Sequence, residues 1–243
     1  NFMNHIISGL FAGNAVVGKV SEHTSWSALY YSQIVQEALK LHGHNPDLCG
    51  LITGFGDAGA ALVASPHVDK IIFTGSPPIG KLVMETASKY LKPAILELGC
   101  NDAMAIVEDC KLSDVRPWFM RGCYQNGGQN CVGAERVFCY ESLYDKFIET
   151  VVPKVQNLRQ GNPLSDVDCG SLVMDAQIDH IQALVEDAVQ RGAKCLVGGK
   201  RKSGQFYEPT VLTHVTPDMR IFHEEVFGPV MTIIQVPNDS DDK

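Results

Sequence analysis

The sequence predicts an α/β protein with a parallel sheet that helices cover on both faces. Three observations lead to this fold class. Short β-branched runs bounded by glycine or proline alternate with helical segments through the first 99 residues. The alternation resumes after residue 130, and residues 175–191 keep a helical period of apolar side chains. The 243 residues are also enough for two domains, and we place a boundary near residue 99.

The expected elements follow from these periods. Before the boundary, a helix opens the chain, and strands and helices then alternate over residues 14–19, 24–42, 48–53, 57–65, 70–73, 78–90 and 94–98. Beyond it, we expect helices over 114–123, 143–158 and 175–191, and strands over 137–140, 193–197 and 231–236. Strands joined through helices run parallel, so the first domain should be a Rossmann-like sheet.

Composition excludes several functional classes. The formal net charge of −8 argues against nucleic acid or an anionic membrane as the main partner, because both attract basic surfaces. No apolar run approaches the roughly 20 residues that span a bilayer, and no secretory signal opens the chain. The eight cysteines form no CxxC pair. We therefore expect free thiols, no metal site, and an intracellular location in the cytoplasm or an organelle.

Three glycine-rich or charged turns are candidates for cofactor binding. Residues 54–59 read GFGDAG and fit a dinucleotide loop, but the acidic residue expected about 20 positions later is missing, which favours a plain turn. Gly75 and Ser76 precede a helix whose free amides could hold a phosphate or simply form a cap. Lys19 and Glu22 follow a strand and could hold ribose hydroxyls, or could be solvated loop charges. An acid there would repel a 2′-phosphate, which favours NAD over NADP.

Two residues are candidates for catalysis. Glu97 lies in an apolar strand, where partial desolvation would make it a better general base, unless it occupies an exposed edge. Cys131 lies in GGQNCVGAER, residues 127–136, whose glycines let the backbone approach a substrate. The alternative is one more structural cysteine. A caspase-like protease would need a histidine about 50 residues upstream, and the chain has none between His67 and His180.

Five motifs in order resemble those of the aldehyde dehydrogenase superfamily. They are GNAVVGK (13–19), FTGS (73–76), LELG (96–99), GQNC (128–131) and EEVFGPV (224–230). The resemblance implies that Cys131 is the nucleophile and Glu97 the general base. It implies that Lys19 and Glu22 hold the adenine ribose, and that Gly75 and Ser76 form the pyrophosphate turn. It further implies that Glu225 holds the nicotinamide ribose and that Phe227 lies beside the nicotinamide.

The implied fold is a partial NAD-binding domain, residues 1–99, and a partial catalytic domain, residues 100–243. The implied reaction oxidises an aldehyde to a carboxylic acid through a thiohemiacetal and a thioester, with NAD, or NADP as the alternative. A semialdehyde of amino-acid metabolism is the alternative substrate, and a catalytically silent structural relative is the alternative function. The resemblance also implies a homo-oligomer at full length.

Three departures from the family pattern qualify the resemblance. The family's Gly-Gly-Lys is replaced by Gly99-Cys100-Asn101, which changes the turn beside the base. The Pro-Trp-Asn motif, whose asparagine is an oxyanion donor in the family, would precede Asn1. The last catalytic segment and the oligomerisation strand would follow Val230. The resemblance therefore implies a central fragment, nearly inactive by itself, since losing one oxyanion donor costs about 100- to 1000-fold in rate.

Overall fold

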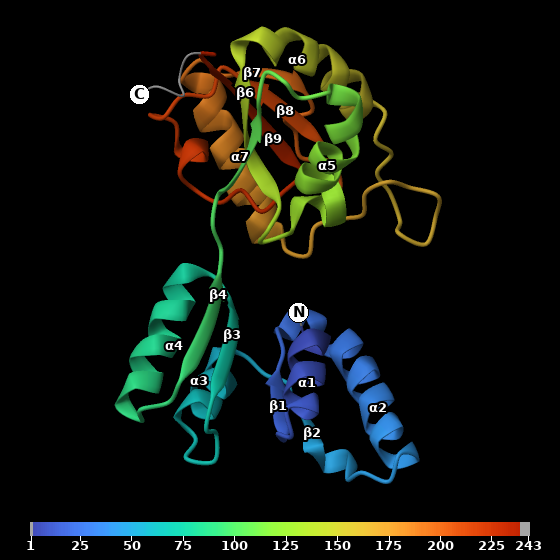
Figure 1. The fold of residues 1–243 in the computed structure, drawn as a ribbon, viewed down its shortest axis with the longest axis vertical. Helices are drawn as coiled ribbons and strands as arrows, with labels where there is room; N and C mark the ends of the chain where they lie inside the picture. The colour runs from blue at the N-terminus through green and yellow to red at the C-terminus, as the bar shows by residue number, and fades with distance from the viewer. Residues whose placement is uncertain (1, 239–243) are drawn as a thin grey trace. The chain divides into compact units, whose positions relative to one another are not determined.

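The computed structural model describes residues 2–238 and confirms the α/β fold class. The chain divides into two compact units, Asn1–Gly99 and Cys100–Lys243, which Figure 1 shows in blue to green and in green to red. No helix within the described residues is long and apolar enough to cross a membrane.

The first unit alternates helices with parallel strands. Its elements are α1 (Phe2–Phe11), β1 (Val16–Lys19), α2 (Ser25–Leu41), β2 (Cys49–Ile52), α3 (Gly56–Ala64), β3 (Ile71–Gly75), α4 (Pro77–Lys89) and β4 (Ala94–Leu98). β1 pairs with β2 and β3 pairs with β4, so the expected parallel pairing takes the form of two separate strand pairs within residues 2–99. Helices connect the paired strands, which is why both pairs are parallel.

The core of the first unit is small. Ile6 from α1, Val35 from α2 and Cys49 from β2 form its buried cluster. In the other strand pair, α4 packs closely on β4 because Gly80 has no side chain, and a Cβ there would lie 2.5 Å from Leu98 Cδ2. The strand ends that carry the candidate cofactor residues therefore rest on few buried side chains.

The second unit is built on a five-stranded mixed sheet. Its helices are α5 (Leu112–Tyr124), α6 (Glu141–Gln156) and α7 (Asp175–Gln190), and its strands are β5 (Asp102–Ile106), β6 (Ala134–Tyr140), β7 (Lys194–Val197), β8 (Thr210–Thr213) and β9 (Val230–Val236). The strand order is β5-β6-β9-β8-β7, and only β7 runs antiparallel to its neighbour within the described sheet. β5 and β8 were not predicted from the sequence.

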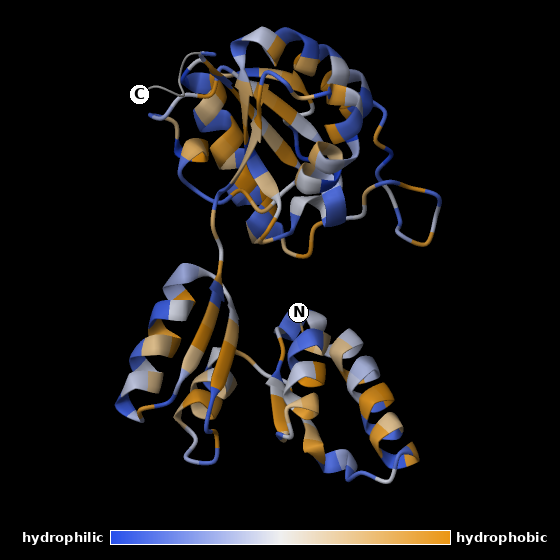
Figure 2. Ribbon diagram, in the orientation of Figure 1, coloured by the Kyte–Doolittle hydropathy of each residue, from blue (hydrophilic) through white to orange (hydrophobic). Residues whose placement is uncertain are grey.

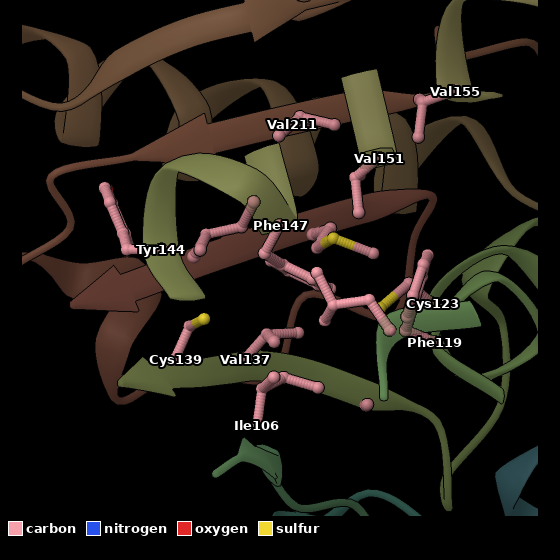
Figure 3. Close-up of a cluster of buried hydrophobic side chains, with 14 of the residues drawn as sticks. Ile106, Phe119, Cys123, Val137, Cys139, Tyr144, Phe147, Val151, Val155 and Val211 are labelled. Carbon is pink, nitrogen blue, oxygen red and sulfur yellow. The ribbon is translucent and has the colours of Figure 1, made fainter. Parts of the chain in front are cut away.

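Two hydrophobic cores lie on opposite faces of this sheet. Successive residues of β8 and β9 alternate between them, since Val211 and Ile233 join one core and Leu212 and Ile234 the other. Figure 2 shows the strands of this unit as mainly hydrophobic. The core beneath α5 and α6 is drawn in Figure 3. In it the rings of Phe119 and Phe147 pack edge to face, with their centroids 5.0 Å apart. This packed sheet is the support for the loops described next.

Candidate active site

The turn that leads to Cys131 has an unusual backbone. It follows α5, and Asn126, Gly127 and Gly128 all have positive φ, between 56° and 74°. Asn126 and Gln129 stabilise it, because the side-chain amide of each donates to the backbone carbonyl of the other at 3.0 Å. Gln129 Oε1 also accepts from the Val173 amide at 3.0 Å. The turn is thus held in one conformation before the chain reaches the cysteine.

Cys131 lies at the end of this turn, just before β6. Its side chain is half-buried, and the following residue, Val132, is 77% exposed. Gly133 is buried so closely that a Cβ would lie 2.8 Å from the Gly122 carbonyl oxygen. Within residues 2–238 the Cys131 N–H donates to no acceptor. A reachable thiol beside a free amide donor is the arrangement that nucleophilic catalysis with oxyanion stabilisation requires.

The segment of residues 224–229 lies directly against the turn before the cysteine. Gly128 faces the Gly228–Pro229 backbone, and a Cβ on Gly128 would overlap the Gly228 carbonyl oxygen. Only glycine allows two backbones to approach so closely. The second unit therefore brings the Cys131 turn together with the segment that carries Glu225 and Phe227.

Side chains hold the carbonyl groups of this segment. Asn101 Nδ2 donates to the carbonyl of residue 224 at 3.0 Å, and Gln177 Nε2 donates to that of residue 226 at 2.8 Å. His180 Nε2 lies 3.0 Å from the carbonyl oxygen of residue 225. The anchors come from Asn101, just before β5, and from α7, two places far apart in sequence, so the segment is fixed by the fold of the whole unit.

A buried carboxylate holds the amides of the same segment. Glu135 of β6 accepts from Val226 N at Oε2, 2.8 Å, and from Phe227 N at Oε1, 2.7 Å. Burial raises the Glu135 pKa to about 7, the two amide hydrogen bonds oppose that rise, and the nearby Glu225 and Asp102 carboxylates add to it.

Glu225 itself is half-buried. Burial raises the pKa of its carboxylate, and the hydrogen bond from the Cys100 backbone N–H opposes that rise only in part. Phe227 has φ of 47°, the left-handed region that bulky residues rarely adopt. Both side chains are therefore presented by a backbone whose carbonyl and amide groups are held by side chains of the same unit.

The turn that departs from the family pattern makes specific contacts of its own. Cys100 Sγ donates to Asp102 Oδ1 at 3.2 Å and to the Cys131 carbonyl at 3.5 Å. The hydrogen bond to Asp102, followed by burial, raises the Cys100 pKa to about 11. Asn101 holds the carbonyls of Ile221 and of residue 224. The replacement residues thus tie the start of the second unit to both loops of the candidate site.

The cofactor candidates of the first unit lie at carboxyl ends of its strands. Lys19 ends β1, and its Nζ is 3.9 Å from Glu22 Oε2. Gly75 ends β3, and Ser76 is the N-cap of α4, with no capping hydrogen bond from its side chain. These are the positions at which a parallel sheet offers donors and acceptors to a ligand.

Glu97 lies in β4 of the first unit, opposite Thr74 of β3. Within the first unit its side chain is exposed, which matches the alternative of an exposed sheet edge, and its role as the general base stays a prediction. It forms no ion pair within residues 2–238. Glu97 and Cys131 belong to different units.

Sequence reasoning missed the roles of the residues that anchor the segment of residues 224–229, namely Asn101, Glu135, Gln177 and His180. One local signal was available, since Glu135 is an acidic residue at the second position of a strand that is mainly apolar from Val137 onward. The others lie on helices or turns with ordinary polar surroundings and are recognisable only once distant segments are brought together.

Comparisons with known proteins agree on one family. A family model described as "Aldehyde dehydrogenase family" matches residues 1–242. An aldehyde dehydrogenase-like protein of Schizosaccharomyces pombe is 38% identical over 242 residues, covering 97% of this chain and 46% of its own length. The chain therefore spans about half the length of such relatives.

Solved structures show the same likeness. A succinate-semialdehyde dehydrogenase from Burkholderia pseudomallei aligns with a TM-score of 0.93 at 31% identity, covering 99% of this chain and 50% of its own. A glyceraldehyde-3-phosphate dehydrogenase from Methanocaldococcus jannaschii, in complex with NADP, aligns with a TM-score of 0.90 at 32% identity, covering 98% of this chain and 52% of its own.

Proposed function

Because the chain belongs to the aldehyde dehydrogenase family, we propose that the protein oxidises an aldehyde to a carboxylic acid, with Cys131 as the nucleophile. The observation that carries the proposal is the second unit's site. A half-buried thiol with a free backbone amide lies on a turn that packs against the segment of Glu225 and Phe227.

The first step forms a bond between Cys131 sulfur and the aldehyde carbon. The carbonyl electrons move to oxygen, and the Cys131 N–H is placed to donate to that oxyanion. A bound NAD+ would supply the acceptor for the hydride that leaves the carbon as its carbonyl re-forms, and the product on Cys131 would then be a thioester.

We assign hydrolysis of the thioester to Glu97. An exposed carboxylate without an ion-pair partner in the described residues is free to take a proton from water. The resulting hydroxide attacks the thioester carbon, the C–S bond breaks, and the Cys131 thiolate leaves with the carboxylic acid released. In the full-length protein, Glu97→Gln should preserve one burst of NADH per enzyme and abolish the steady state, because the thioester then accumulates.

Each unit taken by itself carries residues whose chemistry suits part of a nicotinamide dinucleotide. Lys19 and Glu22 form a donor–acceptor pair suited to a ribose diol. The turn of Gly75 and Ser76 before α4 is assigned to the pyrophosphate, and its own amides have to supply the donors because Pro77 and Pro78 at the first two helical positions have none. Glu225 offers a half-buried carboxylate for the second ribose. We propose NAD+ as the cofactor and NADP+ as the alternative, since the Glu22 carboxylate would repel a 2′-phosphate. Competition between the two dinucleotides for the protein tests this preference.

A semialdehyde is the alternative substrate class. The solved structure of a succinate-semialdehyde dehydrogenase aligns over nearly the whole chain, which supports it. Steady-state kinetics with a panel of simple aldehydes and semialdehydes would distinguish the two, because kcat/KM should favour the ω-carboxylated members only in the second case. An intracellular location agrees with the eight free cysteines.

Thiol labelling with and without NAD+ tests the proposed function. Iodoacetamide should modify Cys131 faster than the other cysteines at pH 7.5, because the pKa values of the two exposed thiols, Cys100 and Cys195, are raised. Addition of NAD+ should change the rate at Cys131 alone. A Cys195→Ser variant is the matched control. A Cys131 no more reactive than the rest would favour the catalytically silent relative.

A further inference from the structure

The segment that carries Glu225 and Phe227 depends on one carboxylate for its amide hydrogen bonds. We propose that Glu135 is a positioning residue, which fixes the backbone of Val226 and Phe227 and thereby the orientation of the Glu225 and Phe227 side chains toward the cofactor. The inference rests on the proposed function, because it assigns a purpose to the two side chains that this backbone presents.

The geometry of Glu135 is bidentate. Each of its two oxygens accepts from one of two consecutive amides, at 2.8 and 2.7 Å, the short distances typical of hydrogen bonds to a charged acceptor. Its backbone is also fixed, since Thr232 of β9 donates to the Glu135 carbonyl at 2.8 Å. Only 5% of the residue is exposed, so water cannot replace these bonds without opening the unit.

The two hydrogen bonds act where the backbone most needs them. Phe227 has φ of 47°, which costs energy for any residue with a Cβ. On release of its amide, the residue would relax toward an ordinary conformation and its ring would turn away. Asn101, Gln177 and His180 hold only carbonyls, so none of them replaces the acceptor that Glu135 supplies.

The charged groups around Glu135 indicate that its carboxylate has a role other than stabilising the fold. The groups that face it are the Glu225 and Asp102 carboxylates and the Cys123 thiol of α5, and no cation is among its partners within the described residues. A buried carboxylate without a cation is a cost to folding. Burial raises the Glu135 pKa to about 7, because a charged carboxylate is unfavourable in the buried core. An apolar residue would serve the core better, whereas only a two-oxygen acceptor serves the loop.

Glu135→Gln tests the inference, with Glu149→Gln on the exposed side of α6 as the matched control. Glutamine keeps the shape but presents an NH₂ group to one of the two amides. Amide hydrogen exchange at Val226 and Phe227 should become about tenfold faster in Glu135→Gln, and the KM for NAD+ should rise about tenfold. The KM for aldehyde and the iodoacetamide rate at Cys131 without NAD+ should stay unchanged. A loss of folded protein alone would lower kcat at constant KM.

Amide hydrogen exchange and enzyme kinetics together distinguish a failure of the inference about Glu135 from a failure of the proposed function. Unchanged exchange and KM in an active Glu135→Gln enzyme overturn the inference alone. Faster exchange in a protein without any NAD+-dependent activity overturns the proposed function, and the cofactor role of Glu135 with it. If the variant does not fold, exchange in the unmodified protein decides, because unprotected amides at Val226 and Phe227 would contradict the anchor.

Discussion

The two units bury their apolar residues very differently. Each core of the second unit contains fifteen buried hydrophobic residues, whereas the buried cluster described in the first unit contains three. Large apolar side chains of the first unit are 82–92% exposed, namely Phe11, Trp26, Leu41 and Leu91. By itself, the first unit is therefore expected to be far less stable than the second. The proposed nucleophile and the segment of residues 224–229 belong to the well-packed second unit. Lys19, Gly75 and Glu97 belong to the first unit.

This difference suggests a division of roles. The sheet of the second unit can keep the Cys131 turn in place before any ligand binds, which is the preorganisation that covalent catalysis needs. The first unit offers strand ends whose order should increase when a ligand binds, because binding stabilises the folded state by mass action.

The largest expected effect concerns the chemistry itself. In the full-length protein, Cys131→Ala should reduce turnover by about 10⁴-fold or more, since no other group can form the thioester. The Kd for NAD+ should remain within about twofold, because the backbone of the turn is held by Asn126 and Gln129 rather than by the thiol. Stopped-flow NADH formation and calorimetric NAD+ binding measure the two quantities. Residual turnover of a few per cent would place the nucleophile elsewhere.

The next effect tests the packing of the second unit. Phe147 is fully buried and meets Phe119 edge to face, so Phe147→Ala should lower the free energy of unfolding by about 3–5 kcal/mol. Urea unfolding followed by circular dichroism measures the change. Trp118→Ala, at a position 63% exposed on α5, is the control and should cost less than about 1 kcal/mol. A small loss at Phe147 would contradict the well-packed core.

Sequence periodicity was most informative for helices and for strands with regular surroundings. The extent of β4 was predicted at Ala94–Leu98, and α7 was predicted within one residue at its carboxyl end. β8 was not predicted because all four of its residues are buried, so its sequence shows no alternation of apolar and exposed polar residues. β5 begins with Asp102, which resembles a turn residue more than a strand residue.

The site was predictable where local motifs mark it and unpredictable where distant residues support it. The glycines around Cys131 indicate a close backbone approach, and the structure shows one between Gly128 and Gly228. The partnership of Glu135 with Val226 and Phe227 joins residues about ninety positions apart. Such a pairing leaves no periodic pattern in the sequence.

A smaller effect concerns the pH dependence of the stability of the second unit, to which Glu135 belongs. The pKa of Glu135 is about 7 when folded, against an ordinary value of 4.5, so the folded protein binds more protons between these values. The contribution of Glu135 to the free energy of unfolding is therefore fully present below about pH 4.5. It falls by about 3 kcal/mol as the pH rises through 7. Urea unfolding of the second unit from pH 4.5 to 8 should show this decline, and Glu135→Gln should reduce it. Equal slopes in both proteins would refute the assignment.

The smallest effect is expected in the first unit. Trp26 is 82% exposed and contacts Tyr30 of the same helix with ring centroids 6.5 Å apart. Trp26→Ala should lower the free energy of unfolding by less than about 1 kcal/mol, because little apolar area is buried there. Urea unfolding and acrylamide quenching of Trp26 fluorescence, in a Trp118→Phe background, measure burial and stability together. A loss of 3 kcal/mol or more, or a quenching-resistant Trp26, would mean that this face of α2 is covered in solution and that the contrast between the units is smaller than the structure indicates.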